Sequence, residues 1–377
     1  MSEMAKPATG PALVAVPRLA EFIARSLEST GVPPEDAAQV GALMAESDAR
    51  GGDAHGIFRL PQYVKQIQQG AVNPKPNIRV VNNRAGTALI DGDNALGHLV
   101  MKLATELAIE KARQCGIGWV GTQHSNHAGP AQLYPRMAAA QDMIGIYFCV
   151  GNTNLVPPWG GTEVLLSTNP IAIAVPGLKH PSIVLDMATT NAAFGKIRLK
   201  AQRGEPMPEG WMIDREGKPL TDAKRASEGF LLPIGGAKGY GLALMIGLLA
   251  GTLNGGAFGR DVIDYTVDSK TPSNTGQSIS VVDIAAFADV KTFKQDVDEV
   301  WDEMKSSPTL PGVDEVRLPG ERSGQIYQER MANGVPLNEG QLKILDELAD
   351  RLGVSRLLSI SKIKNGEIRM EFPHFFV

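Results

Sequence analysis

Residues 233–251 read PIGGAKGYGLALMIGLLAG, a glycine-rich turn directly ahead of an apolar helix. Backbone N–H groups at such a turn, the positive helix end and the charge of Lys238 suit a phosphate group. The turn matches neither the GxxxxGK[ST] phosphate loop nor a GxGxxG motif that follows a strand, so we exclude the Walker and Rossmann folds. A tightly packed turn that binds no ligand is the alternative interpretation.

The overall composition is that of a globular protein with a sizeable core. The chain has 377 residues, 43% of them hydrophobic, and a formal net charge of −4. Without a basic stripe, we expect no nucleic-acid partner. Cys115 and Cys149 stand apart from any Cys/His cluster, so we expect neither a disulfide framework nor a zinc site. Without a signal peptide or a bilayer-length apolar stretch, we expect no membrane association and a cytoplasmic location.

Hydrophobic spacing divides the chain into a helical start and a mixed centre. After Pro74, short β-rich runs alternate with helices, which favours an α/β or mixed-sheet core. A long polar excursion is expected at 200–232, and Asn365-Gly366 predicts a hairpin at 363–370. The expected helices are 17–30, 31–51, 60–70, 97–116, 239–252, 293–307 and 338–354. The expected strands are 77–81, 86–92, 116–122, 142–150, 169–177 and 182–188.

The stretch GGDAHGIFRLPQY at residues 51–63 places a histidine four positions before an arginine. Arg59 can hold a carboxylate through paired hydrogen bonds, and His55 can donate or accept a proton near neutral pH. Together they predict a pocket for a ligand with a carboxylate and a transferable proton. A surface arginine beside a histidine that caps a helix is the alternative.

Two further stretches carry polar residues where strands pass into helices. Within residues 121–138, His127 could act as a general acid or base, and Asn126 could orient a carbonyl group. His124 and His127 have no carboxylate close in sequence, so we expect no metal. Within residues 185–196, Asp186 ends an apolar strand, and the small residues after it allow close approach of a flat or phosphorylated ligand. Local hydrogen bonding and tight packing are the alternatives.

In combination and in this order, these stretches resemble one family, the malate/L-lactate dehydrogenases of the non-Rossmann type. That family also includes ureidoglycolate and sulfolactate dehydrogenases and the piperideine/pyrroline-2-carboxylate reductases. The resemblance covers about residues 17 to 354. Its markers are HGIFRLPQY (55–63), SNHAGPAQLY (125–134), STNPIAIAVP (167–176), DMATTNAAFGKI (186–197), GGAKGYGLALM (235–245) and PGERSGQIYQERMANGVPL (319–337).

The resemblance implies an α/β fold of the non-Rossmann malate/L-lactate dehydrogenase type, and a homodimer. A large mixed sheet would bind the cofactor, and a helical subdomain would be built from both chain ends. We accordingly expect an N-terminal helical substrate and dimer region at 11–75 and a mixed α/β NAD(P)-binding core at 76–310. A C-terminal helical region that returns to the first is expected at 311–355, followed by an extension with the hairpin at 356–377.

The implied activity is hydride transfer between NAD or NADP and a small 2-hydroxy or 2-oxo acid, such as malate or lactate. The resemblance implies that His127 is the acid/base partner of this carboxylate substrate. The substrate pocket would be lined by His55, Arg59, Asn126 and Thr189, of which His55 and Arg59 are also implied to be catalytic. The implied cofactor contacts are Asp186, Met187, Ala188, Lys238, Pro319, Gly320 and Glu321.

Two departures from the family pattern bear on the substrate. Ala54 stands where many relatives have a serine, which belongs to a proposed proton relay in the imino-acid reductases. Lys196 stands where those reductases tend to carry an acidic residue. Both departures favour a 2-hydroxy acid. A cyclic imino-acid reductase is the alternative enzyme, and Ala54 leaves open a catalytically silent binding protein of the same fold.

Overall fold

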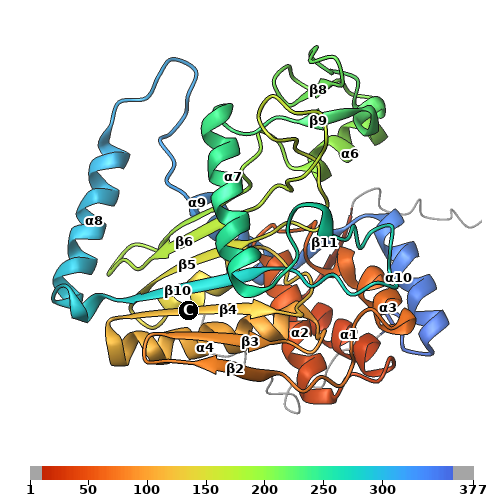
Figure 1. The fold of residues 1–377 in the computed structure, drawn as a ribbon, viewed down its shortest axis with the longest axis horizontal. Helices are drawn as coiled ribbons and strands as arrows, with labels where there is room; N and C mark the ends of the chain where they lie inside the picture. The colour runs from red at the N-terminus through yellow and green to blue at the C-terminus, as the bar shows by residue number, and fades with distance from the viewer. Residues whose placement is uncertain (1–10, 360–377) are drawn as a thin grey trace, which may run out of the picture. The chain divides into compact units, whose positions relative to one another are not determined.

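The computed structural model describes residues 11–359, which form two compact units (Figure 1). The first unit joins the residues up to Val64 to a C-terminal segment that starts at Ser323. The second unit spans Lys65–Arg322. The hairpin predicted at 363–370 lies outside the described residues. Within the described ranges, no helix is both long enough and apolar enough to cross a membrane.

The second unit is built on a seven-stranded sheet in the order β2-β3-β4-β10-β5-β6-β7. Strands β3 and β4 are parallel, and every other neighbouring pair is antiparallel, so the predicted mixed sheet is confirmed. The strands are β2 Arg79–Asn83, β3 Thr87–Asp91, β4 Ile117–Gln123, β5 Met143–Cys149, β6 Ile171–Val175, β7 Ile183–Met187 and β10 Gln277–Asp283.

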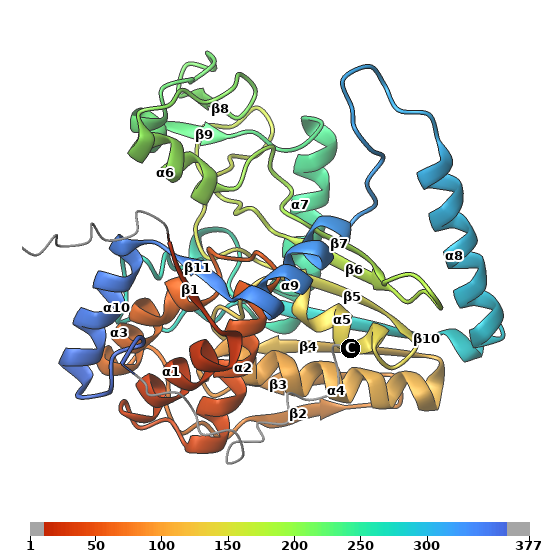
Figure 2. The same cartoon turned by 180° about the vertical axis from the view of Figure 1, so that it is seen from behind.

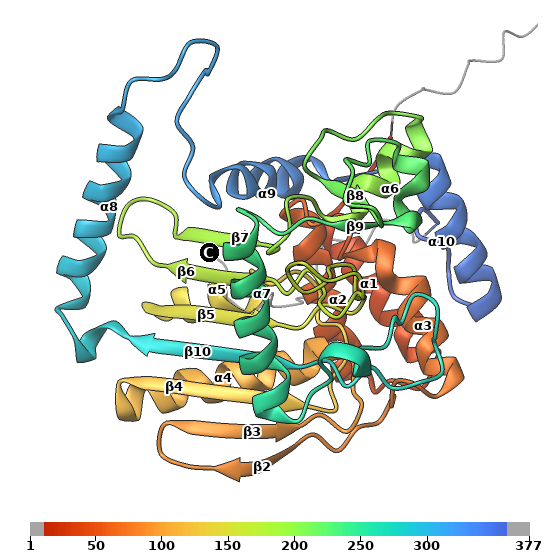
Figure 3. The same cartoon turned by 45° about the horizontal axis from the view of Figure 1, so that its top comes forward.

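Helices cover both faces of this sheet. Helix α4 (Gly97–Cys115) packs on β4 and β10, and α5 (Leu133–Ala139) packs on β5 and β6. Helix α7 (Ala237–Ala250) contacts β5 and β10, and Figure 3 shows it in front of the sheet with α4 behind. Gly116 ends α4 in a left-handed conformation at φ 81°, which a residue without Cβ adopts readily. A further helix, α8 (Val290–Ser306), follows β10.

The polar excursion predicted at 200–232 carries short secondary-structure elements. This stretch contains the end of α6 (Phe194–Arg203), the antiparallel strands β8 (Met212–Asp214) and β9 (Gly229–Leu231), and a 3-10 helix at Ala223–Glu228. Its scattered apolar residues pack into a small core that they share with residues from other segments, such as Val156 and Leu166. Buried members of that core include Ile197, Met207, Met212, Leu220 and Leu231.

The first unit ties together segments from both ends of the described chain, as the resemblance implied. Its helices are α1 Val16–Glu28, α2 Pro34–Ala49, α10 Glu339–Leu352, the start of α3 (Leu60–Gln69) and most of α9 (Glu321–Asn333). Strand β1 (Ala12–Val14) pairs antiparallel with β11 (Val335–Leu337), and Figure 2 shows the two strands side by side. Helices α1 and α2 cross closely, since a Cβ on Gly41 would lie 2.5 Å from the Ala20 oxygen.

Candidate active site

In the first unit, residues 50–59 form a tight loop between α2 and α3. The His55 N–H donates to the Gly52 oxygen at 2.8 Å, and the Arg59 N–H donates to the Gly56 oxygen at 2.9 Å. Arg59 ends a short 3-10 helix, Ile57–Arg59, and its Nε donates back to the Ala54 oxygen at 2.8 Å. This bond fixes the plane of the guanidinium, so the loop holds His55 and Arg59 in defined positions.

His55 is electrically neutral at neutral pH. Burial among protein atoms, and then the positive charge of Arg59, lower the pKa of His55 to about 4. Part of the ring still reaches solvent. A neutral imidazole at this position can accept a proton or a hydrogen bond, but it is not a reservoir of protons at pH 7.

In the second unit, Asn126 anchors the turn that carries His127. The Asn126 amide donates to the oxygens of Asn94 at 3.0 Å and Ala95 at 2.9 Å. Gln277 donates to the Asn126 backbone oxygen at 3.1 Å. Asn126 is 3% exposed, and its buried Oδ1 has no hydrogen-bond partner within residues 11–359. A buried acceptor without a partner is costly, so this atom suits a donor on a bound ligand.

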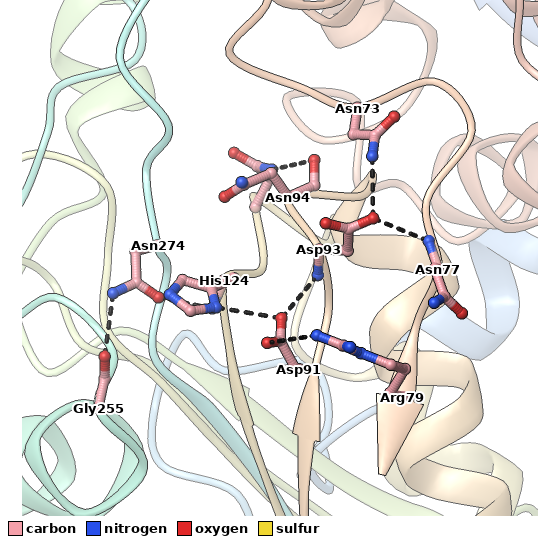
Figure 4. Close-up of polar contacts among 10 residues, drawn as sticks. Asn73, Asn77, Arg79, Asp91, Asp93, Asn94, His124, Gly255 and Asn274 are labelled. Carbon is pink, nitrogen blue, oxygen red and sulfur yellow. Dashed lines mark hydrogen bonds and ion pairs between the residues drawn. The ribbon is translucent and has the colours of Figure 1, made fainter. Parts of the chain in front are cut away.

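The two histidines of this turn have different surroundings. His124 belongs to a surface network in which its Nδ1 lies 3.1 Å from Asp91 and its backbone N–H donates to Asn274 at 2.6 Å (Figure 4). Asp91 also pairs with Arg79 at 3.6 Å. The backbone of His124 has a positive φ of 48°, a strained conformation that this network holds in place. His124 therefore supports the turn that leads to His127.

His127 is half-buried and stacks on Tyr265, with 5.5 Å between the ring centroids. Its Nδ1 accepts a weak hydrogen bond from the Gly129 N–H at 3.4 Å. An accepting Nδ1 favours the neutral tautomer with the proton on Nε2. Sequence reasoning missed Tyr265, because it lies far along the chain in a segment without a recognisable motif.

Asp186 lies near the end of β7, beside the start of α5. The Gln132 N–H donates to its Oδ2 at 3.2 Å. Burial raises the pKa of Asp186 to about 6, although the hydrogen bonds of Gln132 and the positive charge of Arg136 lower it. Asp186 is also exposed to solvent. The Gln132 contact brings the segment after His127 next to the end of β7.

Segments that are far apart in sequence contact β7 or the residues that follow it. The Ile234 N–H donates to the Thr189 oxygen at 3.0 Å, which aligns the residues after Asp186 with the turn before Lys238. The Val184 N–H donates to the Pro319 oxygen at 3.0 Å. A Cβ on Gly320 would lie 3.0 Å from Val184, so this turn approaches β7 with bare backbone.

The remaining predicted residues differ in what their side chains offer. Lys238 is exposed in the first turn of α7, and Met187 and Ala188 are half-buried. Thr189 is fully buried, and its hydroxyl donates to the Thr168 oxygen at 2.9 Å. The Glu321 carboxylate accepts from Lys305 at 2.8 Å and from the Leu318 N–H at 3.0 Å. Thr189 and Glu321 thus hold their own segments in place.

Comparison with known proteins identifies the family. A family model described as malate/L-lactate dehydrogenase matches residues 14–346, so the chain belongs to that family. It is 40% identical over 348 residues to malate dehydrogenase of Pyrococcus horikoshii, covering 90% of this chain and 95% of the relative. It is 34% identical over 319 residues to ureidoglycolate dehydrogenase (NAD(+)) of Escherichia coli K12, covering 85% and 90%.

A solved structure confirms the fold. Sulfolactate dehydrogenase of Methanocaldococcus jannaschii superposes with a TM-score of 0.86 at 38% identity, covering 91% of this chain and 98% of that one. The non-Rossmann malate/L-lactate dehydrogenase-type fold predicted from the sequence is confirmed. The chain is an oxidoreductase that transfers hydride between a nicotinamide cofactor and a 2-hydroxy or 2-oxo acid, as its sequence predicted.

Proposed function

We propose that this enzyme interconverts a small 2-hydroxy acid and its 2-oxo acid with NAD or NADP, and that malate or a close relative is the substrate. The supporting observation is that, within one unit, the segment after His127, the turn before Lys238 and the Pro319 turn each contact β7 or the residues that follow it. The first listed relatives act, by their names, on malate or sulfolactate, which are both dicarboxylate-like 2-hydroxy acids.

These segments fit a dinucleotide. Lys238 and the first N–H groups of α7 offer positive charge to a pyrophosphate. Ala188 offers a small side chain to a flat ring directly after Asp186 and Met187, which end β7, and Gly320 offers bare backbone beside Val184 of the same strand. Because the Glu321 carboxylate already binds Lys305 and Leu318, Pro319, Gly320 and Glu321 would contact the cofactor through backbone atoms. When bound, the nicotinamide accepts or supplies the hydride.

His127 is the proposed acid/base. In the direction of oxidation, its neutral imidazole takes the proton of the 2-hydroxyl group while hydride leaves the same carbon; in reduction the imidazolium returns it. Stacking on Tyr265 fixes the plane of the imidazole ring. The buried Oδ1 of Asn126 offers an acceptor to a donor group of the substrate or the cofactor. Thr189 would assist through its backbone, since its hydroxyl is bound to Thr168.

Arg59 is the proposed clamp for the substrate carboxylate, because its planar guanidinium can hold both carboxylate oxygens in one orientation. The neutral His55 beside it adds a hydrogen-bonding group without competing for the negative charge. The charge of Arg59 and the neutrality of His55 are linked, since the cation itself contributes to lowering the pKa of His55.

A panel of substrates tests this function. Malate, lactate, sulfolactate and ureidoglycolate are oxidised with NAD and with NADP, and oxaloacetate, pyruvate and pyrroline-2-carboxylate are reduced with NADH and NADPH. We expect turnover of at least one hydroxy-acid pair. Reduction of pyrroline-2-carboxylate alone would identify an imino-acid reductase, and cofactor binding without any turnover would identify a silent binding protein.

We also propose that the protein is a cytoplasmic homodimer. Helix α7 presents apolar side chains to solvent, including Leu242, Met245 and Leu249, which are 37%, 49% and 37% exposed. Residues three and four positions apart share one face of a helix, so this apolar face suits a second copy of the chain. The free thiols of Cys115 and Cys149 agree with a reducing compartment.

A further inference from the structure

Asp48 is a buried carboxyl group that the proposed chemistry does not use. It lies in the last turn of α2 and is only 2% exposed. Its Oδ2 accepts the N–H of Ile57 at 2.7 Å. Ile57 stands between His55 and Arg59 in the chain, so this carboxyl group is bonded to the centre of the loop that carries both residues.

The contact between Asp48 and the loop depends on a glycine. A Cβ on Gly56 would lie 2.1 Å from Oδ1 of Asp48 and 2.3 Å from its Oδ2. No real side chain tolerates such a distance, so the carboxyl group packs directly against the bare backbone of Gly56. The loop is thereby held by a hydrogen bond and by close packing at adjacent residues.

Arg330 holds the other side of the same loop. From α9, its Nη1 donates to the backbone oxygen of Asp48 at 2.6 Å and also pairs with the carboxylate of Asp53. The Arg330 side chain is 13% exposed and its contact with the Asp48 oxygen is partly buried, whereas Asp53 is exposed. Another α9 residue, Ser323, donates to the Arg50 oxygen at 3.0 Å. Helix α9 thus binds the loop at its start and its middle.

We infer that Asp48 and Arg330 are positioning residues, which hold residues 50–59 in the conformation that presents His55 and Arg59 to the substrate. This inference rests on the proposed function of that loop. Neither residue has a role in the proton or hydride transfer. Their effect is geometric, and a displacement of about 1 Å at a clamp can cost on the order of 100-fold in rate.

A chemical role for the Asp48 carboxyl group and a positioning role predict different effects of substitutions at residue 48. An asparagine keeps the shape of the side chain and an acceptor oxygen for the Ile57 N–H, whereas an alanine leaves that buried N–H without a partner. We therefore expect Asp48→Asn to retain the KM for the 2-hydroxy acid within about 3-fold, and Asp48→Ala to raise it by about 10-fold or more. Glu35→Ala removes an exposed acid from the same helix and should change nothing.

The test combines steady-state kinetics, titration of NADH fluorescence and hydrogen exchange of residues 50–59. We expect Asp48→Ala and Arg330→Met to raise the KM, to leave NADH affinity unchanged and to speed exchange of the loop amides. Arg330→Lys should recover part of the loss, because it retains a charged donor for the Asp48 oxygen. Circular dichroism confirms that each variant is folded.

Two results would overturn the inference. One is loop exchange in Asp48→Ala and Arg330→Met that equals that of the wild type. The other is equal damage by Asp48→Asn and Asp48→Ala, which would assign the effect to the acid itself. If the wild-type enzyme turned over no hydroxy acid, the proposed function would fail, and the exchange measurement would still decide whether these residues hold the loop.

Discussion

The carboxyl group of Asp48 makes the stability of the protein depend on pH. Burial, the first cause, raises its pKa from 3.8 to about 8 against the opposing effect of the Ile57 N–H. Between these two values the unfolded chain releases the proton and the folded chain keeps it, so stability falls as the pH rises from about 4 to 8. The amide in Asp48→Asn cannot titrate.

We therefore expect the melting temperature of Asp48→Asn to exceed that of the wild type by an amount that grows across this pH range. Thermal unfolding at four or five pH values measures the difference. A constant difference would show that the carboxyl group titrates at the same pH in both states.

Arg59 affects the titration of His55. The folded-state pKa of His55, about 4, lies below its ordinary value of 6.5, so the contribution of its neutral form to stability is present above pH 6.5 and is lost between 6.5 and 4. Replacing Arg59 by methionine removes the smaller of the two causes. We expect the pKa of His55 to rise but to stay below 6.5, as followed by NMR, with His55→Gln to assign the signal. An unchanged pKa would leave burial as the sole cause.

His127 and His124 provide a matched pair of variants. Removal of a general acid/base costs about 100- to 10,000-fold in turnover, so we expect His127→Ala to lose most of kcat while NADH binding is retained. His124→Ala removes an imidazole three residues away that binds Asp91, and we expect it to keep most of the activity. Wild-type turnover in His127→Ala would remove that residue from the mechanism.

At the scale of elements, the turn at Pro319–Glu321 depends on close packing against β7. Gly320 has φ 86°, and a Cβ there would meet Val184 at 3.0 Å. We expect Gly320→Ala to raise the KM for the cofactor by about 10-fold, because the turn must move away from the strand. Gly312→Ala is the control: Gly312 has a similar φ of 81° but nothing within 4 Å. Equal effects of the two variants would assign the loss to backbone strain alone.

The elements that the sequence predicts well are those with a regular apolar pattern. The helices α1, α2, α4 and α10 and the six predicted strands all exist. Strand β10 was missed, although it lies at the centre of the sheet. Its residues Ser278 and Ser280 are polar but buried, and Ser278 accepts from the buried Asn254 at 2.8 Å. The strand alternates between serine and apolar residues from Ser278 to Val281, but both of its faces are buried, so its modest hydrophobicity does not mark it as a central strand.

In the candidate site, too, the sequence predicts some of the residues and misses others. The motif residues lie on turns whose glycines and polar side chains mark them in the sequence. The residues that hold those turns, such as Arg330, Asn274 and Tyr265, come from distant segments, and although Arg330 lies within the marker at 319–337, nothing in that marker pairs it with the loop at 50–59. Contacts of this kind arise from the tertiary fold, so local spacing carries no signal for them.

At the scale of the whole molecule, the apolar face of α7 predicts the oligomeric state. Burying charges there is costly, so we expect Met245→Glu combined with Leu249→Glu to convert a dimer into a monomer in light-scattering measurements. The matched control is Leu178→Glu, since Leu178 is a 38% exposed leucine outside this helix. A monomeric wild type, or a variant that remains dimeric, would contradict the proposed contact.

The pairing of β1 with β11 has a consequence for the synthesis of the enzyme. Strand β1 is synthesised hundreds of residues before β11 and Arg330. The loop with His55 can therefore gain the contacts from Ser323 and Arg330 only after α9 has been synthesised. A chain that stops before α9 would carry His55 and Arg59 but would lack the contacts that hold their loop.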